Sequence, residues 1–201
     1  MASSKSKDPA LQVSWIRLEV LVVKAYAGIG SRMTPEPILA LMKDIGAALA
    51  RQGWVLRSGA APDADTAFEV GCDLAGGTKE VFLPWKGFQK RELIGGVQLL
   101  APEIVPAAEE IAAQAHTRWQ FLRRPVKALH TRNVCQVLGP HLDEPAKFIL
   151  CWTLNGGGAG GTGQALRIAA PRGVNVFDLG SPEVLARIQA WTKSGYTQTM
   201  T

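Results

Sequence analysis

Ala27-Gly28-Ile29-Gly30-Ser31-Arg32 follows an apolar run over residues 18–27 and precedes Thr34-Pro35-Glu36. The near-continuous apolar run is typical of a central strand that is buried on both faces. Thr34-Pro35-Glu36 predicts a helix start, with a hydroxyl at the N-cap and proline at the first helical position. A strand, a glycine turn and a helix in this order form the repeating unit of a parallel α/β sheet.

Two more segments repeat this order. Residues 57–65 follow Trp54-Val55-Leu56, and the glycine-rich residues 156–164 follow residues 148–152, Phe-Ile-Leu-Cys-Trp. Further strands are expected at 78–84 and 173–179, and helices at 64–76, 160–170 and 182–193. The pattern predicts a Rossmann-like, doubly wound α/β fold with a mostly parallel sheet and helices on both faces.

The region from about 86 to 145 interrupts the alternation. Helical periodicity at 103–118 and 126–138 predicts a helical insertion there. We expect a flexible leader at 1–15, a single domain at 16–194 and a loose tail at 195–201. The 201 residues, 47% of them hydrophobic, are enough for one such domain.

Composition restricts the function classes. The three cysteines Cys72, Cys135 and Cys151 are far apart and set in apolar surroundings, which predicts buried thiols in a reducing, cytoplasmic setting and argues against disulfides or zinc. No metal or cofactor is expected. The apolar stretch 15–23 contains Arg17 and Glu19 and is too short to span a membrane. The net charge of +5 suits an anionic ligand, although it also suits a solubilising surface.

The glycine turns predict a shared phosphate-binding site, because the carboxyl ends of parallel strands meet at one edge of the sheet. Glycine lets the backbone approach a ligand, and a helix N-terminus offers free N–H groups to a phosphate. A tight strand-to-helix turn or a flexible loop would explain the same residues without a ligand. The candidate binding residues in these segments are Gly28, Gly30, Ser31, Arg32, Ser58, Gly59, Thr153, Gly160, Gly161, Thr162 and Gly163.

Asp65 and Glu69 lie four residues apart, on one face of the expected second helix. They could bind ribose hydroxyls or act as a general acid and base. Asp65 could instead hold a neighbouring loop, or the acids at this helix start could simply cap the helix. Trp85 follows the third strand and could stack on a base or pack at the rim. Arg132-Asn133, at the expected start of a helix, could bind phosphate or base, or form an exposed polar turn.

Residues 58–69 resemble the Ser-Gly-x-Ala-x-Gly-x-Asp segment of DNA-processing protein A (DprA/Smf). Gly28-Ile29-Gly30-Ser31-Arg32 looks like the Gly-x-Arg turn of that family, and Gly160-Gly161-Thr162 looks like its last phosphate-binding element. Over residues 25–179 the chain is similar to the SLOG superfamily, which joins that family to the Lonely Guy proteins, and in particular to short stand-alone phage and prophage versions. The resemblance implies a nucleotide-type ligand and a homodimer or higher homo-oligomer.

The chain departs from both families. Where the Lonely Guy motif Pro-Gly-Gly-x-Gly-Thr-x-x-Glu has its threonine and glutamate, this chain has Gln164 and Leu166, and no carboxylate. DNA-processing protein A commonly has histidine at the position of Glu69 and glycine at that of Asp63. The two carboxylates would add negative charge where DNA phosphates would bind.

Three functions therefore stay open. The first is binding of a nucleotide-derived small molecule, ADP-ribose-like or a cyclic nucleotide, in a phage or prophage sensor or sponge. The second is single-stranded DNA binding in recombination, with Arg123, Arg124 and Lys127 as contacts. The third is hydrolysis of a nucleotide N-glycosidic or phosphate bond, with Glu69 as the acid/base and Asp65 stabilising positive charge on the sugar.

Overall fold

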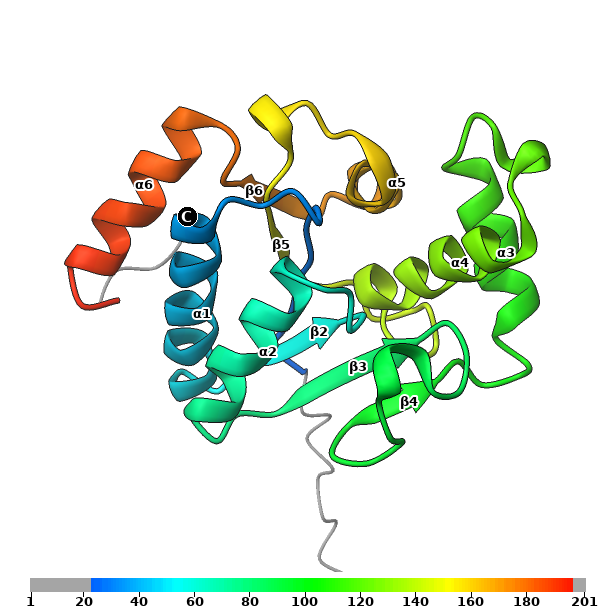
Figure 1. Cartoon of the computed structure of the whole chain (residues 1–201), viewed down its shortest axis with the longest axis horizontal. Coiled ribbons are helices and arrows are strands. Elements are labelled where there is room, and N and C mark those ends of the chain that lie inside the picture. Colours follow the sequence, from blue (N-terminus) through cyan, green and yellow to red (C-terminus); the bar gives the residue numbers. More distant parts are fainter. Residues whose placement is uncertain (1–22, 197–201) are drawn as a thin grey trace, which may run out of the picture.

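The computed structural model describes residues 23–196, and these form a six-stranded sheet in the order β4-β3-β2-β1-β5-β6 (Figure 1). Every strand pair is parallel. The predicted Rossmann-like α/β fold is thus confirmed. The strands are β1 (Ala25–Gly28), β2 (Val55–Ser58), β3 (Lys79–Leu83), β4 (Val97–Leu99), β5 (Phe148–Cys151) and β6 (Asn175–Asp178).

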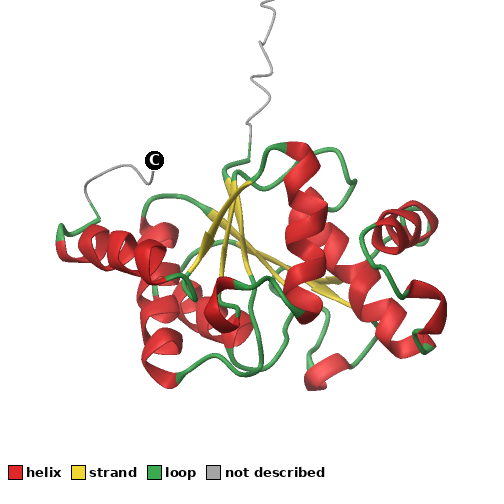
Figure 2. Ribbon diagram, turned by 90° about the horizontal axis from the view of Figure 1, so that it is seen from above, coloured by secondary structure: helices red, strands yellow, loops and turns green. Residues whose placement is uncertain are grey.

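Helices cover both faces of the sheet (Figure 2). Along β1, Tyr26 packs in a cluster with α1, α2 and α6, whereas Ala27 packs in a second cluster with α3, α4 and α5. Alternate strand residues point to opposite faces, so one short strand contributes to both cores. The helices are α1 (Glu36–Arg51), α2 (Ala64–Leu74), α3 (Val105–Gln114), α4 (Arg124–Leu138), α5 (Gly160–Ala169) and α6 (Pro182–Lys193), with short 3₁₀ turns η1 (Phe88–Lys90), η2 (Trp119–Phe121), η3 (Leu154–Gly156) and η4 (Ala170–Arg172).

The strand order reverses at β1. From β1 the chain proceeds through β2 and β3 to β4 on one side, while β5 pairs with the other side of β1, where Ala27 lies opposite Ile149 and Gly28 opposite Leu150. A crevice opens at such a switch point beyond the carboxyl ends of the strands. The fold therefore places the turns after β1 and β5 side by side.

The expected insertion at 86–145 differs from the prediction. It contains β4, whose three residues Val97–Leu99 pair with β3, so the sheet is one strand wider than the sequence indicated. It also contains the whole of α4, which begins at Arg124 and not at 126. Arg132 and Asn133 were expected at a helix start, and they lie instead in the middle of this helix.

The first strand and the first helix also begin later than expected. β1 covers Ala25–Gly28, and residues 18–22 of the predicted strand lie outside the described residues, as does the expected leader. The N-cap position of α1 is Pro35 and not Thr34. The Thr34 hydroxyl donates to the Ser31 carbonyl at 2.6 Å and so stabilises the preceding turn.

The prediction of buried thiols is confirmed, because Cys72, Cys135 and Cys151 are free and buried. Among residues 23–196, none of the helices combines the length and the apolar character needed to cross a membrane.

Candidate functional site

A cavity of about 560 Å³ lies at the switch point between β1 and β5. The turn after β1, the start of α2, the middle of α4 and the start of α5 all line it, so segments more than a hundred residues apart in the chain meet there. The lining residues are Ile29, Gly30, Ser31, Arg32, Met33, Ala61, Pro62, Asp65, Phe88, Gln89, Val126, Leu129, His130, Arg132, Asn133, Gln136, Ala159, Gly160, Gly161, Thr162 and Ala165.

The turn after β1 is fixed by the neighbouring strand and by its own side chains. Ile29 N–H donates to the Leu150 carbonyl at 3.1 Å, and Ser31 N–H donates to the Trp152 carbonyl at 3.3 Å. A Cβ on Gly30 would lie 2.5 Å from the Cβ of Ala64. This glycine thus permits the close approach of α2, which is a packing reason for its presence beside any role with a ligand.

Gly28 has the same packing role, because a Cβ there would lie 2.7 Å from the Phe68 ring. It does not line the cavity. Ser31 and Arg32 do, and the Arg32 side chain is exposed at the cavity. Three of the four residues predicted in this turn, Gly30, Ser31 and Arg32, thus lie at the cavity, and Gly28 does not.

The start of α5 faces the cavity through Gly160, Gly161 and Thr162. The first N–H groups of a helix have no acceptor within the helix, and they carry the positive end of its dipole. Gly163 lies behind them, and a Cβ there would be 1.6 Å from the Gly158 carbonyl oxygen. Gly163 therefore allows the loop to fold against the helix.

Thr153 stabilises this loop from outside the cavity. Its N–H donates to Asp178 Oδ1 at 2.8 Å, and its hydroxyl donates to Asp178 Oδ2 at 2.5 Å. The Thr153 hydroxyl also accepts from Gly158 N–H at 3.0 Å. The residue predicted to contact the ligand thus ties the glycine loop to the end of β6.

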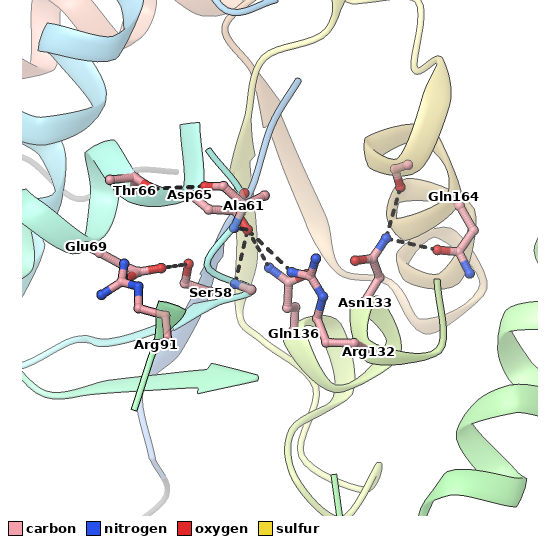
Figure 3. A network of polar contacts seen from close by, with 12 residues as sticks. Ser58, Ala61, Asp65, Thr66, Glu69, Arg91, Arg132, Asn133, Gln136 and Gln164 are labelled. Carbon is pink, nitrogen blue, oxygen red and sulfur yellow. Dashed lines mark hydrogen bonds and ion pairs between the residues drawn. The ribbon is translucent and has the colours of Figure 1, made fainter. Parts of the chain in front are cut away.

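Asp65 lies at the floor of the cavity and holds the neighbouring loop (Figure 3). Its Oδ2 atom accepts from the N–H groups of Gly59 at 3.0 Å and Ala61 at 3.4 Å, and from Gln136 Nε2 at 3.4 Å. Of the alternatives for Asp65, the loop-holding contact is present. Among the described residues, none donates to the other oxygen, Oδ1, which leaves one acceptor for a ligand hydroxyl.

Burial raises the pKa of the Asp65 carboxyl from its ordinary value of 3.8 to about 6. The Arg132 guanidinium opposes this rise, the Glu69 carboxylate adds to it, and the N–H groups of Ala61 and Gly59 oppose it. Desolvation disfavours the charged carboxylate more than its partners favour it. The ionisation state of the cavity floor therefore changes near pH 6.

Arg132 is 4% exposed and also lies at the cavity floor. Its Nη1 atom donates to Gln136 Oε1 at 3.0 Å and lies 3.5 Å from Asp65 Oδ2. Its Nε atom is buried and has no hydrogen-bond partner among the described residues. A buried polar atom left unpaired is rare. Among the described residues, the Tyr26 hydroxyl and His130 Nδ1 share this state with Arg132 Nε.

Gly59 makes room for Arg132. A Cβ at position 59 would lie only 1.0 Å from Arg132 Nη1, so any side chain there would displace the guanidinium. Gly59 and Ser58 do not line the cavity. Their place in the site is behind Asp65 and Arg132.

Glu69 is 1% exposed and lies outside the cavity lining. The Ser58 hydroxyl donates to its Oε1 at 2.6 Å, and Arg91 Nη2 donates to its Oε2 at 2.5 Å. Both carboxylate oxygens are thus occupied by the protein. The structure does not bring Glu69 and Asp65 together at one reacting centre.

The sequence pointed to Trp85, and the aromatic side chain at the cavity is Phe88. Trp85 is 41% exposed, packs edge-to-face on Phe88 with ring centroids 5.1 Å apart, and does not line the cavity. Phe88 lies with its ring centroid 6.0 Å from Arg132 Cζ, within the range of a cation–π contact.

Sequence reasoning also missed Gln136 and His130. Gln136 could have been found, because it lies four residues after Arg132 on the same face of one helix. Burial lowers the pKa of the His130 imidazole. The Gln164 amide donates to the His130 carbonyl at 3.4 Å.

Asn133 links α4 to α5 at the rim of the cavity. Its amide donates to the Gly161 carbonyl at 3.3 Å and to Gln164 Oε1 at 3.2 Å. The polar interactions of this amide are thus with the start of α5, whose first N–H groups it helps to position.

The charged groups of the cavity favour an anion. Two guanidinium groups, Arg32 and Arg132, and one carboxylate, Asp65, are present in the lining, together with the N-terminus of α5. Within residues 23–196 no group of three His, Cys, Asp or Glu side chains is placed to hold a metal ion.

Comparison with solved structures shows the fold. Two structures of a molybdenum cofactor carrier protein from Chlamydomonas reinhardtii are similar to this chain. They are 16% and 15% identical to it, and in both cases the match covers 86% of each chain with a TM-score of 0.51. No protein-family model matches the sequence, and no curated protein matches it either.

Proposed function

We propose that the protein binds a nucleotide-derived small molecule in the cavity at the switch point and holds it without converting it. The observation that carries this proposal is Arg132 at the cavity floor, whose buried Nε donor has no partner within residues 23–196. A planar guanidinium presents its N–H groups as a fork that suits phosphate or carboxylate oxygens. Nε itself is buried, so a ligand oxyanion would satisfy this donor through a rotation of the Arg132 side chain.

A second anion-binding element is the opposite wall, formed by Gly160–Thr162 and Arg32. Free N–H groups at a helix N-terminus, a threonine hydroxyl and an exposed guanidinium form a phosphate site of a common kind. Together with Arg132, this wall favours a ligand with more than one phosphate group, such as ADP-ribose or a cyclic dinucleotide.

The remaining lining suits the other parts of such a ligand. Phe88, Val126 and Leu129 give an apolar wall against which a base can lie. The unpaired Oδ1 atom of Asp65 can accept from a ribose hydroxyl.

Binding is favoured over turnover by the state of the carboxylates. Glu69, the expected acid/base, is occupied by Ser58 and Arg91, and Asp65 is the one carboxylate among the described lining residues. The carrier proteins of similar fold are named for a small molecule that they carry, which agrees with a holding role. In this proposal the protein acts as a sensor or sponge for a signalling nucleotide.

Native mass spectrometry of the purified protein tests the proposal, before and after addition of ADP-ribose, cyclic dinucleotides, AMP, molybdenum cofactor and a short DNA oligomer. We expect an intact nucleotide to bind, and the same spectra give the oligomeric state. Arg132→Gln should strongly weaken the complex, and Arg51→Gln, on the exposed end of α1, should not.

Other outcomes would overturn the proposal. Release of base and sugar phosphate would show an enzyme. Binding of the short DNA oligomer, and of no nucleotide, would show a DNA-binding protein. The exposed Arg123 and Arg124 at the start of α4 would then be the first contacts to test.

A further inference from the structure

The loop between β3 and β4, residues 84–96, forms one wall of the cavity. Phe88 and Gln89 of this loop line the cavity, and the Phe88 ring lies over the Arg132 guanidinium at 6.0 Å. Trp85 supports Phe88 from the outer side through their edge-to-face contact. The position of the loop therefore determines the shape of the cavity beside Arg132.

The loop has an unusual backbone at this wall. Gln89 and Lys90 have φ values of 51° and 56°, and Gly87 has a φ of 78°. Residues other than glycine adopt this left-handed region rarely, and they persist there only where the surrounding structure holds them. Local turn hydrogen bonds are short-range, such as Lys90 N–H to the Gly87 carbonyl at 3.0 Å. The loop thus needs an anchor on the body of the protein.

Arg91 provides a polar anchor, beside the packing of Phe88 against Ala60, Val81 and Leu83. Its side chain is 32% exposed and reaches from the loop to Glu69 on α2, where Nη2 donates to Oε2 at 2.5 Å (Figure 3). Glu69 is 1% exposed and is held from the other side by the Ser58 hydroxyl. A carboxylate buried this deeply is stable only when it is paired and hydrogen-bonded, so the pair is strongly constrained.

We propose that Glu69 is a positioning residue, which acts through Arg91 to hold Phe88 against the cavity, and that Phe88 makes the cavity select ligands that carry a planar ring. This inference rests on the proposed function, because the wall belongs to the same cavity. It assigns to Glu69 a role in ligand selection instead of proton transfer.

Hydrogen–deuterium exchange without ligand tests the anchor. In Glu69→Gln, the amides of residues 85–91 should exchange about tenfold faster than in the wild type, while those of α2 stay unchanged. Asp73→Asn is the matched control, because it makes the same chemical change on α2 in an exposed pair with Lys79. Loop exchange equal in both variants would overturn the anchor. Arg91→Gln removes the pair from its exposed side should Glu69→Gln not fold.

Ligand selection is tested with ADP-ribose and with ribose 5-phosphate, which has no base. Phe88→Leu and Glu69→Gln should each weaken ADP-ribose binding about tenfold and change ribose 5-phosphate binding less than twofold. Arg91→Lys, which keeps the charge, should restore most of the affinity that Arg91→Gln loses. If the variants lost affinity for ADP-ribose and for ribose 5-phosphate to the same extent, the cause would be general destabilisation. That result would overturn ring selection.

The two proposals fail in different ways. If the wild type binds neither compound nor any other nucleotide tested, the proposed function fails and ring selection fails with it. The exchange experiment still decides whether Glu69 holds the loop.

Discussion

Arg57 and Arg132 are both buried, yet they differ in how completely the protein pairs them. Arg57 on β2 is 1% exposed, and its Nε donates to Glu80 at 2.7 Å while its Nη1 donates to the Glu144 carbonyl. Its Nη2 lies 3.8 Å from a Glu144 carboxylate oxygen. Arg132 has one long contact to Asp65, one hydrogen bond to Gln136 and an orphaned Nε.

The difference separates a structural arginine from a binding one. All three nitrogens of Arg57 have partners within the chain, and it lies outside the cavity. Arg132 lies in the cavity lining, and its Nε has no hydrogen-bond partner among the described residues. Each arginine also packs against a glycine, Gly139 for Arg57 and Gly59 for Arg132, so the two sites can be perturbed in parallel.

Arg57→Met should have the largest effect. It leaves the Glu80 carboxylate and the Glu144 carbonyl without their buried donor, and we expect the free energy of unfolding to fall by about 4 kcal/mol. Urea denaturation followed by circular dichroism measures this loss, with Arg51→Met on the surface as control. A loss below about 1 kcal/mol would mean that Arg57 is no more important than a surface pair.

The pH dependence of stability should reveal the counter-ion of Arg132. The pKa of Asp65 is about 6 in the folded protein and 3.8 ordinarily. Because the pKa of Asp65 is raised in the folded protein, its protonated carboxyl adds to the free energy of unfolding. This contribution is fully present below pH 3.8 and is lost as the pH rises to 6. Relative to Asp65→Asn, the wild type should lose up to about 3 kcal/mol of stability between pH 4 and 6.5.

Urea midpoints of both proteins across this range give the answer. Asp73→Asn, which changes an exposed acid on the same helix, should run parallel to the wild type at every pH. If the wild type instead became more stable relative to Asp65→Asn as the pH rises, the sign would be opposite. That result would contradict a desolvated Asp65 carboxyl with a raised pKa.

Arg132→Met should separate binding from stability. Loss of a charged hydrogen bond to the ligand should weaken ADP-ribose binding by about 2 kcal/mol, or about 30-fold. The free energy of unfolding should change by about 1 kcal/mol or less, because Asp65 keeps Gly59, Ala61 and Gln136 as donors. Isothermal titration and urea denaturation should rank Arg57→Met and Arg132→Met in opposite orders. If both measurements ranked the two variants in the same order, the claim that Arg57 serves stability and Arg132 serves binding would be contradicted.

The two glycine variants should give the smallest effects and the sharpest contrast. Gly139→Ala forces alanine to a φ of 82° and places its Cβ 2.9 Å from Arg57 Nη2, so stability should fall by about 1–2 kcal/mol with binding unchanged. Gly59→Ala displaces Arg132 and should weaken ADP-ribose binding about fivefold, or about 1 kcal/mol. Thermal denaturation and titration on the same preparations compare them; equal ADP-ribose affinity in Gly59→Ala and Gly139→Ala would contradict the proposal.

Local sequence signals predicted the fold well where an apolar run precedes a glycine turn. The apolar runs before Gly28 and Gly156 identified β1 and β5, and the turns that follow them meet as expected. The pattern failed at Val97–Leu99, because a strand of three residues is too short to show alternation. The helix predicted at 126–138 is α4, which begins two residues earlier, at Arg124, because Pro125 is favoured in the first turn.

The site was harder to predict because its contacts are long-range. Asp65 and Arg132 were each expected as candidates, but nothing local to either residue indicates that they meet, or that Gly59 is small to admit Arg132. Trp85 and Phe88 lie three residues apart, and Gly87 between them has a left-handed φ of 78°, which changes the direction of the chain before Phe88. Side-chain direction in an irregular loop does not follow from spacing.

The pairing of β1 with β5 has a consequence for the order in which the protein forms. β1 can pair with β2 soon after synthesis, but its other edge waits for residues 148–151, more than a hundred positions later. Contacts of such long range form slowly, and an unpaired edge is prone to aggregate while it waits. The cavity is thus completed only when α5 packs beside the strands formed earlier. During synthesis, the chain lacks this cavity until most of its residues have left the ribosome.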